Sequence, residues 1–399
     1  MANNVLEKQK QEAKLQLQGF AKLIEEEQQA LVDEKEIKKV GYICNYTPVE
    51  LLSAAGVRHS RLIKAGSAKT VSAGELYTQS VFCDFTKSCI GFFQEGDPFY
   101  KSFDKVYNFH TCATMKRASE VIEQFVPTRL LNLPKLRSSE DARNFFREEL
   151  INFKDDLAEL TGKPIDEAEV HKQITLYNQA RSLLKRISEL RKRPDPALTG
   201  AEYLDLVRGY YYLPAEKLLP ALEKVLQSLE ALPEGKRQGL RLMLSGSIMA
   251  DGDRRLLDIV EGELGARVVI EDHCAGVRPF YHKLSEAGDP YLALANGYLD
   301  QAPCARMKPL EDGVEFSGKL AREYAVDGVI YVFLKFCACY GVSKKEFLTE
   351  FQKQELSILE LSSDYSESDY GQLKTRIEAF IEVLNERGDT KGHEQHINA

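Results

Sequence analysis

Four apolar segments of this sequence have the length and composition of β-strands, and each is closely followed by a cysteine. The segments and their cysteines are Val40–Ile43 with Cys44, Lys105–His110 with Cys112, Arg267–His273 with Cys274, and Val329–Phe336 with Cys337. Helical patterns alternate with these strands, and that order predicts parallel sheets. The carboxyl ends of parallel strands line the crevice in which open α/β sheets bind ligands. The sequence therefore predicts an α/β fold with thiols gathered at such a rim.

The pattern along the 399 residues predicts two α/β units separated by helices. We expect an N-terminal helix within residues 1–36, a first α/β domain over 37–134, a helical insertion or linker over 135–236, a second α/β domain over 237–386 and a flexible polar tail over 387–399. The two units are patterned alike, but no internal repeat is visible in their residues.

Two local patterns predict a helix start and a charged helix face. Thr47–Glu50 has the form of a helix start, with Thr47 as N-cap, proline at the first helical position and Glu50 completing a capping box. The basic run Lys185–Arg193 could dock an acidic partner, but a solvated helix face is the better interpretation.

Charge and targeting signals limit where the protein works. A net charge of −8 argues against nucleic acid as the principal partner, because phosphate binding needs a positive surface. No apolar stretch has the length of a membrane span, and the N-terminus lacks the apolar segment of a signal peptide. We therefore expect a cytoplasmic protein, in a reducing compartment where disulfides are rare.

The eight cysteines do not follow the spacing of common thiol sites. The only close pairs are Cys83 with Cys89 and Cys337 with Cys339, so a zinc ribbon is not indicated. No strand is followed by the glycine pattern of a dinucleotide site, and residues 66–70 lack the first glycine of a phosphate loop.

A cysteine nucleophile is a further possibility, because His110 precedes Cys112 and His273 precedes Cys274. That interpretation leaves the other strand-end cysteines unexplained. His110, His273 and Arg278 are therefore only weak catalytic candidates.

The position of several cysteines at predicted strand ends favours a metal cluster. A single cysteine is more often a small buried apolar residue than a ligand. Four strand-end positions that are all cysteine, with Cys83 before an apolar helix and Cys304 in a loop, form a different pattern. Thiolates that converge from several strands suit an iron–sulfur cluster.

Four segments carry a resemblance to a known family. Tyr46–Gly56, Phe109–Arg117, Glu271–Arg278, and Val326–Ile330 together with Lys335–Cys337 resemble the 2-hydroxyacyl-CoA dehydratase and benzoyl-CoA reductase subunits, in order, over residues 38 to 385. The resemblance implies two flavodoxin-like (Rossmann-like) domains with a cluster in the cleft between them. It also implies that three cysteines, matching Cys83, Cys112 and Cys337, hold a 4Fe–4S cluster, which a separate ATP-hydrolysing iron–sulfur reductase supplies with electrons.

The sequence departs from the dehydratase pattern by adding Cys44, Cys274 and Cys304. These additions look like the double-cubane cluster branch, in which six cysteines hold an 8Fe–9S cluster. By this resemblance we expect Cys83, Cys112 and Cys337 on one cubane and Cys44, Cys274 and Cys304 on the other. Cys89 or Cys339 could replace its neighbour.

The resemblance thus implies a homodimeric reductase that takes low-potential electrons from an activator-type ATPase and reduces a small molecule. One alternative is an (R)-2-hydroxyacyl-CoA dehydratase subunit with a 4Fe–4S cluster. A second alternative is an electron-transfer or cluster-storage protein without its own substrate.

Overall fold

Two four-stranded parallel sheets organise the chain, so the predicted α/β class is confirmed. The computed structural model describes residues 2–366 and 369–397. The first sheet contains β1 (Lys39–Tyr42), β2 (Arg58–Arg61), β3 (Lys105–Phe109) and β4 (Thr128–Leu131), and the second contains β5 (Arg241–Gly246), β6 (Arg267–Asp272), β7 (Gly328–Leu334) and β8 (Ser357–Ser363). Their orders, β2-β1-β3-β4 and β6-β5-β7-β8, are equivalent and follow the flavodoxin-like pattern.

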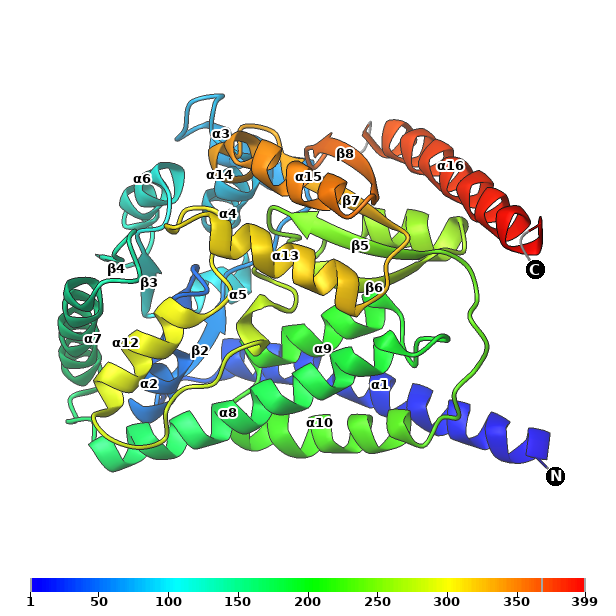
Figure 1. The fold of residues 1–399 in the computed structure, drawn as a ribbon. Helices are drawn as coiled ribbons and strands as arrows, with labels where there is room; N and C mark the ends of the chain where they lie inside the picture. The colour runs from blue at the N-terminus through cyan, green and yellow to red at the C-terminus, as the bar shows by residue number, and fades with distance from the viewer. Residues whose placement is uncertain (1, 367–368, 398–399) are drawn as a thin grey trace.

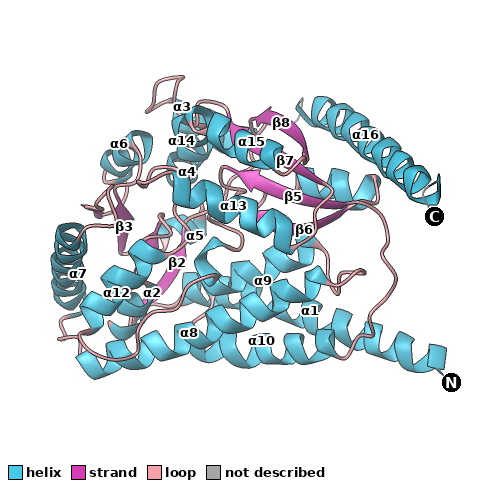
Figure 2. Cartoon of the chain, viewed as in Figure 1, coloured by secondary structure: helices cyan, strands magenta, loops and turns pink. Residues whose placement is uncertain are grey.

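Helices connect the strands of both sheets and cover them (Figures 1 and 2). The first unit has α2 (Val49–Ala54), α3 (Ala68–Glu75), α4 (Asp84–Gln94), α5 (Pro98–Lys101) and α6 (Ala113–Ile122). The second has α11 (Arg255–Leu257), which continues into a π-helical turn (Asp258–Glu263), then α12 (Pro290–Asp300), α13 (Glu311–Glu323), α14 (Ala338–Val342), α15 (Lys344–Lys353) and α16 (Asp369–Ile397).

Four of the remaining helices form a layer that joins the two units. They are α1 (Ala2–Asp33), α8 (Glu167–Glu189), α9 (Gly200–Tyr212) and α10 (Ala215–Glu230), whereas α7 (Glu140–Thr161) packs on α12. Figure 1 shows α1, α8 and α10 running along one side of the molecule, where α1 packs on α9 and α10. Ala13, Phe20, Ile24 and Leu31 of α1 are buried, and one continuous core links the layer to both units.

The predicted capping box at Thr47–Glu50 is wrong. The N-cap residue of α2 is Pro48, and no side chain caps the helix. The Glu50 carboxylate is fully buried, where it accepts hydrogen bonds from Arg181 of α8 and from the Tyr298 hydroxyl of α12, 2.8 Å away. An ion pair with another helix therefore takes the carboxylate that a local cap would have used.

Two further expectations change in the structure. The run Lys185–Arg193 is not a uniformly solvated face, because Arg191 is fully buried, with its Nη1 2.6 Å from Glu271 Oε1. The last helix, α16, does not stop near residue 386 but continues to Ile397, through most of the segment expected as a tail. Residues 398 and 399 lie outside the described residues. Among the helices that the structure describes, none is both long and apolar enough to cross a membrane.

Candidate metal centre

One cavity collects seven of the eight cysteines at the carboxyl ends of strands from both sheets. They are Cys44, Cys83, Cys112, Cys274, Cys304, Cys337 and Cys339. The cavity holds about 780 Å³ of empty space, part of it open to solvent. The structure thus brings together all six cysteines that the sequence singled out, and adds Cys339.

Local structure explains how five of these thiols reach the cavity. Cys44 follows β1 and Cys274 follows β6, each two residues after the strand ends. Cys83, Cys112 and Cys337 are the N-cap residues of α4, α6 and α14. β1 and β3 are neighbours, and the connections after them lead to β2 and β4 on opposite sides. The loops after these two strands therefore flank the switch point where such folds bind ligands.

The thiols fall into two groups by their mutual electrostatic effects. In the first group, Cys83, Cys112 and Cys337, the charges of Cys337 and Cys112 raise the pKa of Cys83. In the second group, Cys44, Cys274 and Cys304, the charges of Cys274 and Cys44 raise the pKa of Cys304, and Cys274 also raises that of Cys44. Each group therefore combines three neighbouring thiols from separate segments of the chain.

Burial sets the protonation of several thiols. It raises the pKa of Cys83 and that of Cys304 to about 12, and it also raises the pKa of Cys44. A buried thiolate is unfavourable unless a positive charge compensates it. Bound metal supplies that charge, so these thiols suit metal ligation better than free thiolate chemistry.

Cys339 lies between two members of the first group. Its side chain is hydrogen-bonded with Cys112 and with Cys337, and for each of them this contact is the largest cause that lowers the pKa, to about 5 for Cys112 and to about 7 for Cys337. Arg306 Nε in turn donates to the Cys339 sulfur. Cys89, in contrast, is fully buried outside the cavity lining, with its sulfur 3.9 Å from the Leu62 carbonyl. The structure therefore separates the two extra cysteines, which the sequence left as equivalent substitutes.

A buried arginine holds the loop of Cys274. Arg61, at the end of β2, places Nη2 3.3 Å from the Cys274 sulfur and donates from Nη1 to its carbonyl at 2.8 Å. Its guanidinium also lies 4.8 Å from the centre of the Tyr211 ring. Sequence reasoning missed Arg61, although its place at the carboxyl end of a strand is the signal that singled out the cysteines.

Hydroxyl groups lie next to three of the sulfurs. Thr86 Oγ1 is 3.2 Å from Cys83 Sγ, Thr114 Oγ1 is 3.2 Å from Cys112 Sγ, and Thr111 Oγ1 is 3.7 Å from Cys44 Sγ. Hydrogen bonds to cluster sulfurs are one way in which a protein tunes a reduction potential.

The three weak catalytic candidates lie outside the lining of the cavity. They are His110, His273 and Arg278. Arg278 is buried in an ion pair with Asp272 and also donates to the Tyr340 hydroxyl, 2.7 Å away. His273 is fully buried, and the structure shows no hydrogen bond to either ring nitrogen within the described part of the chain.

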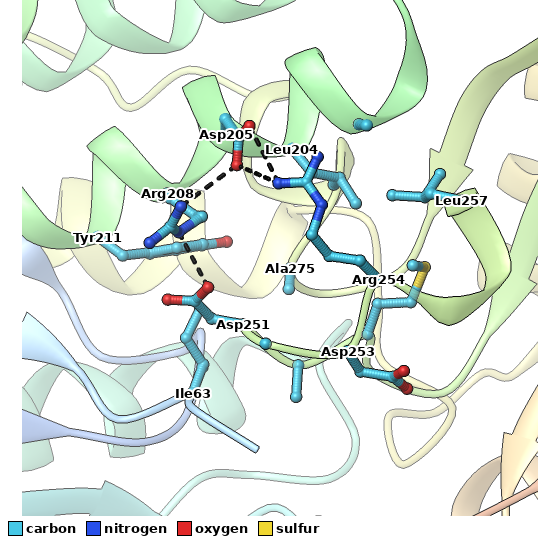
Figure 3. Close-up of a pocket in the computed structure, with 14 residues that line it drawn as sticks. Ile63, Leu204, Asp205, Arg208, Tyr211, Asp251, Asp253, Arg254, Leu257 and Ala275 are labelled. Carbon is cyan, nitrogen blue, oxygen red and sulfur yellow. Dashed lines mark hydrogen bonds and ion pairs between the residues drawn. The ribbon is translucent and has the colours of Figure 1, made fainter. Parts of the chain in front are cut away.

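A smaller pocket lies behind the Cys274 loop, at the seam between the two units (Figure 3). Arg208 lies between Asp205 and Asp251 there, at 3.2 and 3.0 Å, and Arg254 also pairs with Asp205. The backbone of Asp251 bonds to that of Ile63 in the first unit. Since its charged groups are paired with one another, we interpret this pocket as a joint between the units.

The donor set fits a cluster better than a single ion. Within residues 2–366 and 369–397, no three His, Cys, Asp or Glu side chains form a group that could hold one metal ion. The thiols instead surround a cavity that is lined between them by apolar side chains such as Ile43, Phe85 and Met115. Thiols arranged around a cavity of this size suit a larger iron–sulfur group.

Comparison with known proteins identifies the family of this chain as one of dehydratase and reductase subunits. Residues 44–384 match the family model "2-hydroxyglutaryl-CoA dehydratase, D-component". YjiM of Escherichia coli (strain K12), provisionally named a dehydratase subunit, is 29% identical over 88% of this chain and 92% of its own length. One of the subunits of benzoyl-CoA reductase from Thauera aromatica is 25% identical over 75% of this chain and 78% of its own. The beta subunit of (R)-2-hydroxyglutaryl-CoA dehydratase of Acidaminococcus fermentans is 22% identical over 87% of this chain and 92% of its own length.

Proposed function

This chain belongs to the 2-hydroxyglutaryl-CoA dehydratase D-component family, and on that premise we propose that it is an iron–sulfur reductase with an 8Fe–9S double-cubane cluster. The cluster would receive low-potential electrons from a separate ATP-hydrolysing iron–sulfur reductase. The protein would use them to reduce small molecules.

The single observation that carries the proposal is the arrangement of the thiols. Two groups of three cysteines line one cavity, and in each group the charges of two members raise the pKa of the third, Cys83 or Cys304, beyond the effect of burial. Two cubanes with three protein ligands each need that number of thiolates. We therefore assign Cys83, Cys112 and Cys337 to one cubane and Cys44, Cys274 and Cys304 to the other.

The residues around the thiols would hold and tune the bound cluster. The Met115 N–H at the start of α6 lies 3.5 Å from the Cys112 sulfur, and Arg61 places a positive charge beside Cys274. The Met115 contact favours the thiolate of Cys112, which is the form that binds iron.

Two features support a separate electron donor and further subunits. The sequence has no phosphate-binding loop, so ATP hydrolysis would belong to another protein. The names of the relatives also describe subunits of larger enzymes.

We propose a homodimer that meets an activator-type ATPase in the cytoplasm. A reducing compartment suits eight cysteines without a disulfide among them.

Metal analysis tests the cluster directly. After oxygen-free purification we expect about eight irons per chain, with a similar amount of acid-labile sulfide, as two linked cubanes require. About four irons per chain would contradict the double cubane and would favour the second candidate.

The second candidate is a 2-hydroxyacyl-CoA dehydratase subunit with one 4Fe–4S cluster on the first thiol group. The names of several relatives favour it, including the beta subunit of (R)-phenyllactyl-CoA dehydratase of Clostridium sporogenes. Under this candidate, the second thiol group would hold no metal.

Turnover separates a reductase from a carrier or storage protein. The loaded protein, a reducing ATPase of the activator type, ATP and dithionite should convert acetylene to ethylene if the protein is a reductase. Reduction of the cluster without any product would instead favour electron transfer or cluster storage.

A further inference from the structure

Arg61 is the only charged side chain, apart from the cysteines, that lines the cavity of the candidate metal centre within the described part of the chain. The side chain is 2% exposed. Its Nε donates to the Ile43 carbonyl at 3.0 Å and its Nη1 to the Cys274 carbonyl at 2.8 Å, and Nη2 lies 3.3 Å from the Cys274 sulfur. All three nitrogens therefore have a partner, and none of these partners is a carboxylate.

Other arginines with the same degree of burial are balanced by a carboxylate. Three of them are at most 1% exposed, and each forms an ion pair. The pairs are Arg181–Glu50, Arg191–Glu271 and Arg278–Asp272. A buried charge is costly unless an opposite charge lies beside it. Arg61 has a ligand sulfur in the place of the carboxylate, so the negative charge that balances it belongs to the metal centre.

Arg61 distinguishes the second thiol group from the first. Its guanidinium contacts the sulfur of Cys274, which is a member of the second group. Arg306 does not discriminate in this way, because it lies near Cys112 and Cys304, one member of each group. The Arg306 side chain is also only partly buried.

Two further cations lie near the thiols, and neither matches Arg61. Lys135 is exposed, so water and salt screen its charge. Arg278 lies near Cys304, but Asp272 balances its charge. The buried, unbalanced positive charge therefore lies on one side of the cavity, beside the second thiol group.

We propose that Arg61 makes the cubane held by the second thiol group the half of the cluster that accepts the first electron. This inference rests on the proposed function. When titanium(III) citrate is the reductant, one electron leaves titanium, which becomes titanium(IV), and the cluster gains one negative charge. Net charge and hydrogen bonds to sulfur set the reduction potential of an iron–sulfur group. A buried guanidinium beside one cubane stabilises the added charge there and raises the potential of that cubane.

Spectroscopy of the wild type tests where the first electron resides. The protein is produced with arginine that carries the heavy nitrogen isotope, reduced by one electron without oxygen, and measured by pulsed EPR. We expect a hyperfine coupling to guanidinium nitrogen, because Arg61 contacts a ligand sulfur of the reduced cubane. The coupling should persist in the control Arg306→Lys, which keeps a cation beside Cys339.

Iron analysis of the same sample separates the two ways in which this test can fail. With about eight irons per chain, the absence of the coupling, or its loss in Arg306→Lys, would overturn the inference and leave the double cubane in place. About four irons per chain would contradict the proposed function, and the inference would fall with it.

Three variants separate the charge of Arg61 from its contacts with the Cys274 loop. Arg61→Gln removes the charge, whereas Arg61→Lys keeps the charge and loses the forked contact. Tyr211→Phe keeps Arg61 and removes another hydrogen bond to the same loop, from the Tyr211 hydroxyl to the Cys274 carbonyl at 3.0 Å. A purely structural role would make the two Arg61 variants alike.

We expect the equilibrium constant for the first one-electron reduction to fall at least about tenfold in Arg61→Gln, equivalent to a potential about 59 mV lower. Arg61→Lys and Tyr211→Phe should stay close to the wild type. A redox titration followed by EPR measures all four proteins. Equal shifts in the two Arg61 variants, or no shift in an Arg61→Gln protein with its full iron content, would overturn the proposal. If Arg61→Gln binds no iron, the labelled wild type decides.

Discussion

The thiols of the metal centre differ in the charge that they can carry without metal. Cys112 is the N-cap of α6, and hydrogen bonds from Cys339 and Thr114 help to lower its pKa to about 5. Cys83 is 8% exposed, and burial raises its pKa to about 12. At pH 7 the first is a thiolate and the second a thiol. Metal binding would therefore release protons from the buried thiols and make the affinity dependent on pH.

Removal of one thiol tests the six-ligand assignment. We expect Cys304→Ala to lose at least about half of the bound iron, because one cubane would lose one of its three protein ligands. The control Cys89→Ala removes a fully buried thiol outside the cavity and should keep its iron, at a loss of about 1 kcal/mol in unfolding free energy. Iron analysis and oxygen-free denaturant titration measure both. Equal iron loss in the two variants would contradict the assignment.

His59 gives a prediction for pH and stability. It is buried near the start of β2, with Nε2 2.9 Å from Ser53 Oγ, and burial lowers its pKa from 6.5 to about 4. Between pH 4 and pH 6.5 the unfolded chain therefore binds more protons at His59 than the folded protein does. The stabilisation from neutral His59 is present above pH 6.5 and is lost as the pH falls through the window.

From pH 7 to pH 5 this loss amounts to about 2 kcal/mol in the free energy of unfolding. His59→Gln should be less stable at pH 7 but should lose about 2 kcal/mol less over the same interval. Urea unfolding of both proteins at the two pH values measures the difference. Parallel pH profiles would show that His59 is not buried as a neutral ring.

At the level of elements, a buried ion pair joins the helical layer to the second sheet. Arg191, in the short 3₁₀ turn Leu190–Lys192 after α8, donates to Glu271 of β6, and its guanidinium lies 3.9 Å from the centre of the Tyr203 ring. Cys274 follows the same strand two residues beyond its end. The pair therefore fixes the strand that brings a thiol to the cavity.

Arg191→Met should lower the free energy of unfolding by about 3–5 kcal/mol, because it leaves the Glu271 carboxylate buried without its partner. Arg186→Met is the matched control from the same basic run. The Arg186 side chain is 56% exposed and pairs with Glu230, so its loss should cost at most about 1 kcal/mol. Thermal and denaturant unfolding distinguish the two. Similar losses would mean that Arg191 contributes no more than a surface pair.

Local composition predicted the four strands that precede cysteines and the α/β class, but it does not specify tertiary pairs. The strands before Cys44, Cys112, Cys274 and Cys337 were predicted from local composition, and their carboxyl ends meet because parallel sheets align them. The partners of Glu50 and Arg191 lie 131 and 80 residues away, and no local pattern encodes such pairs. The sequence spacing of the cysteines likewise could not distinguish Cys339 from Cys89. The difference depends on which of the two side chains lines the cavity in the folded protein.

In the whole molecule, the candidate metal centre lies where the two units meet. Its lining comes from loops of both sheets, and beside it the backbone of Asp251 bonds to Ile63 and Ala65. The second thiol group itself contains Cys44 from the first unit and Cys274 and Cys304 from the second. A cluster held by these thiols would thus cross-link the two units as well as carry electrons.

Metal removal should therefore loosen the seam between the units and leave the helical layer intact. A ligand that binds only the folded protein stabilises the segments that it joins. When iron is chelated without oxygen, amide hydrogen exchange near Cys44, Cys274 and Cys304 should increase at least about tenfold, equivalent to about 1.4 kcal/mol of local opening free energy. Exchange in α10, whose buried face packs on α1 and α8, serves as the control and should stay unchanged. Mass spectrometry of peptides from these segments measures both. An equal increase in α10 would indicate global unfolding, and no increase at the second thiol group would mean that those thiols do not hold metal across the seam.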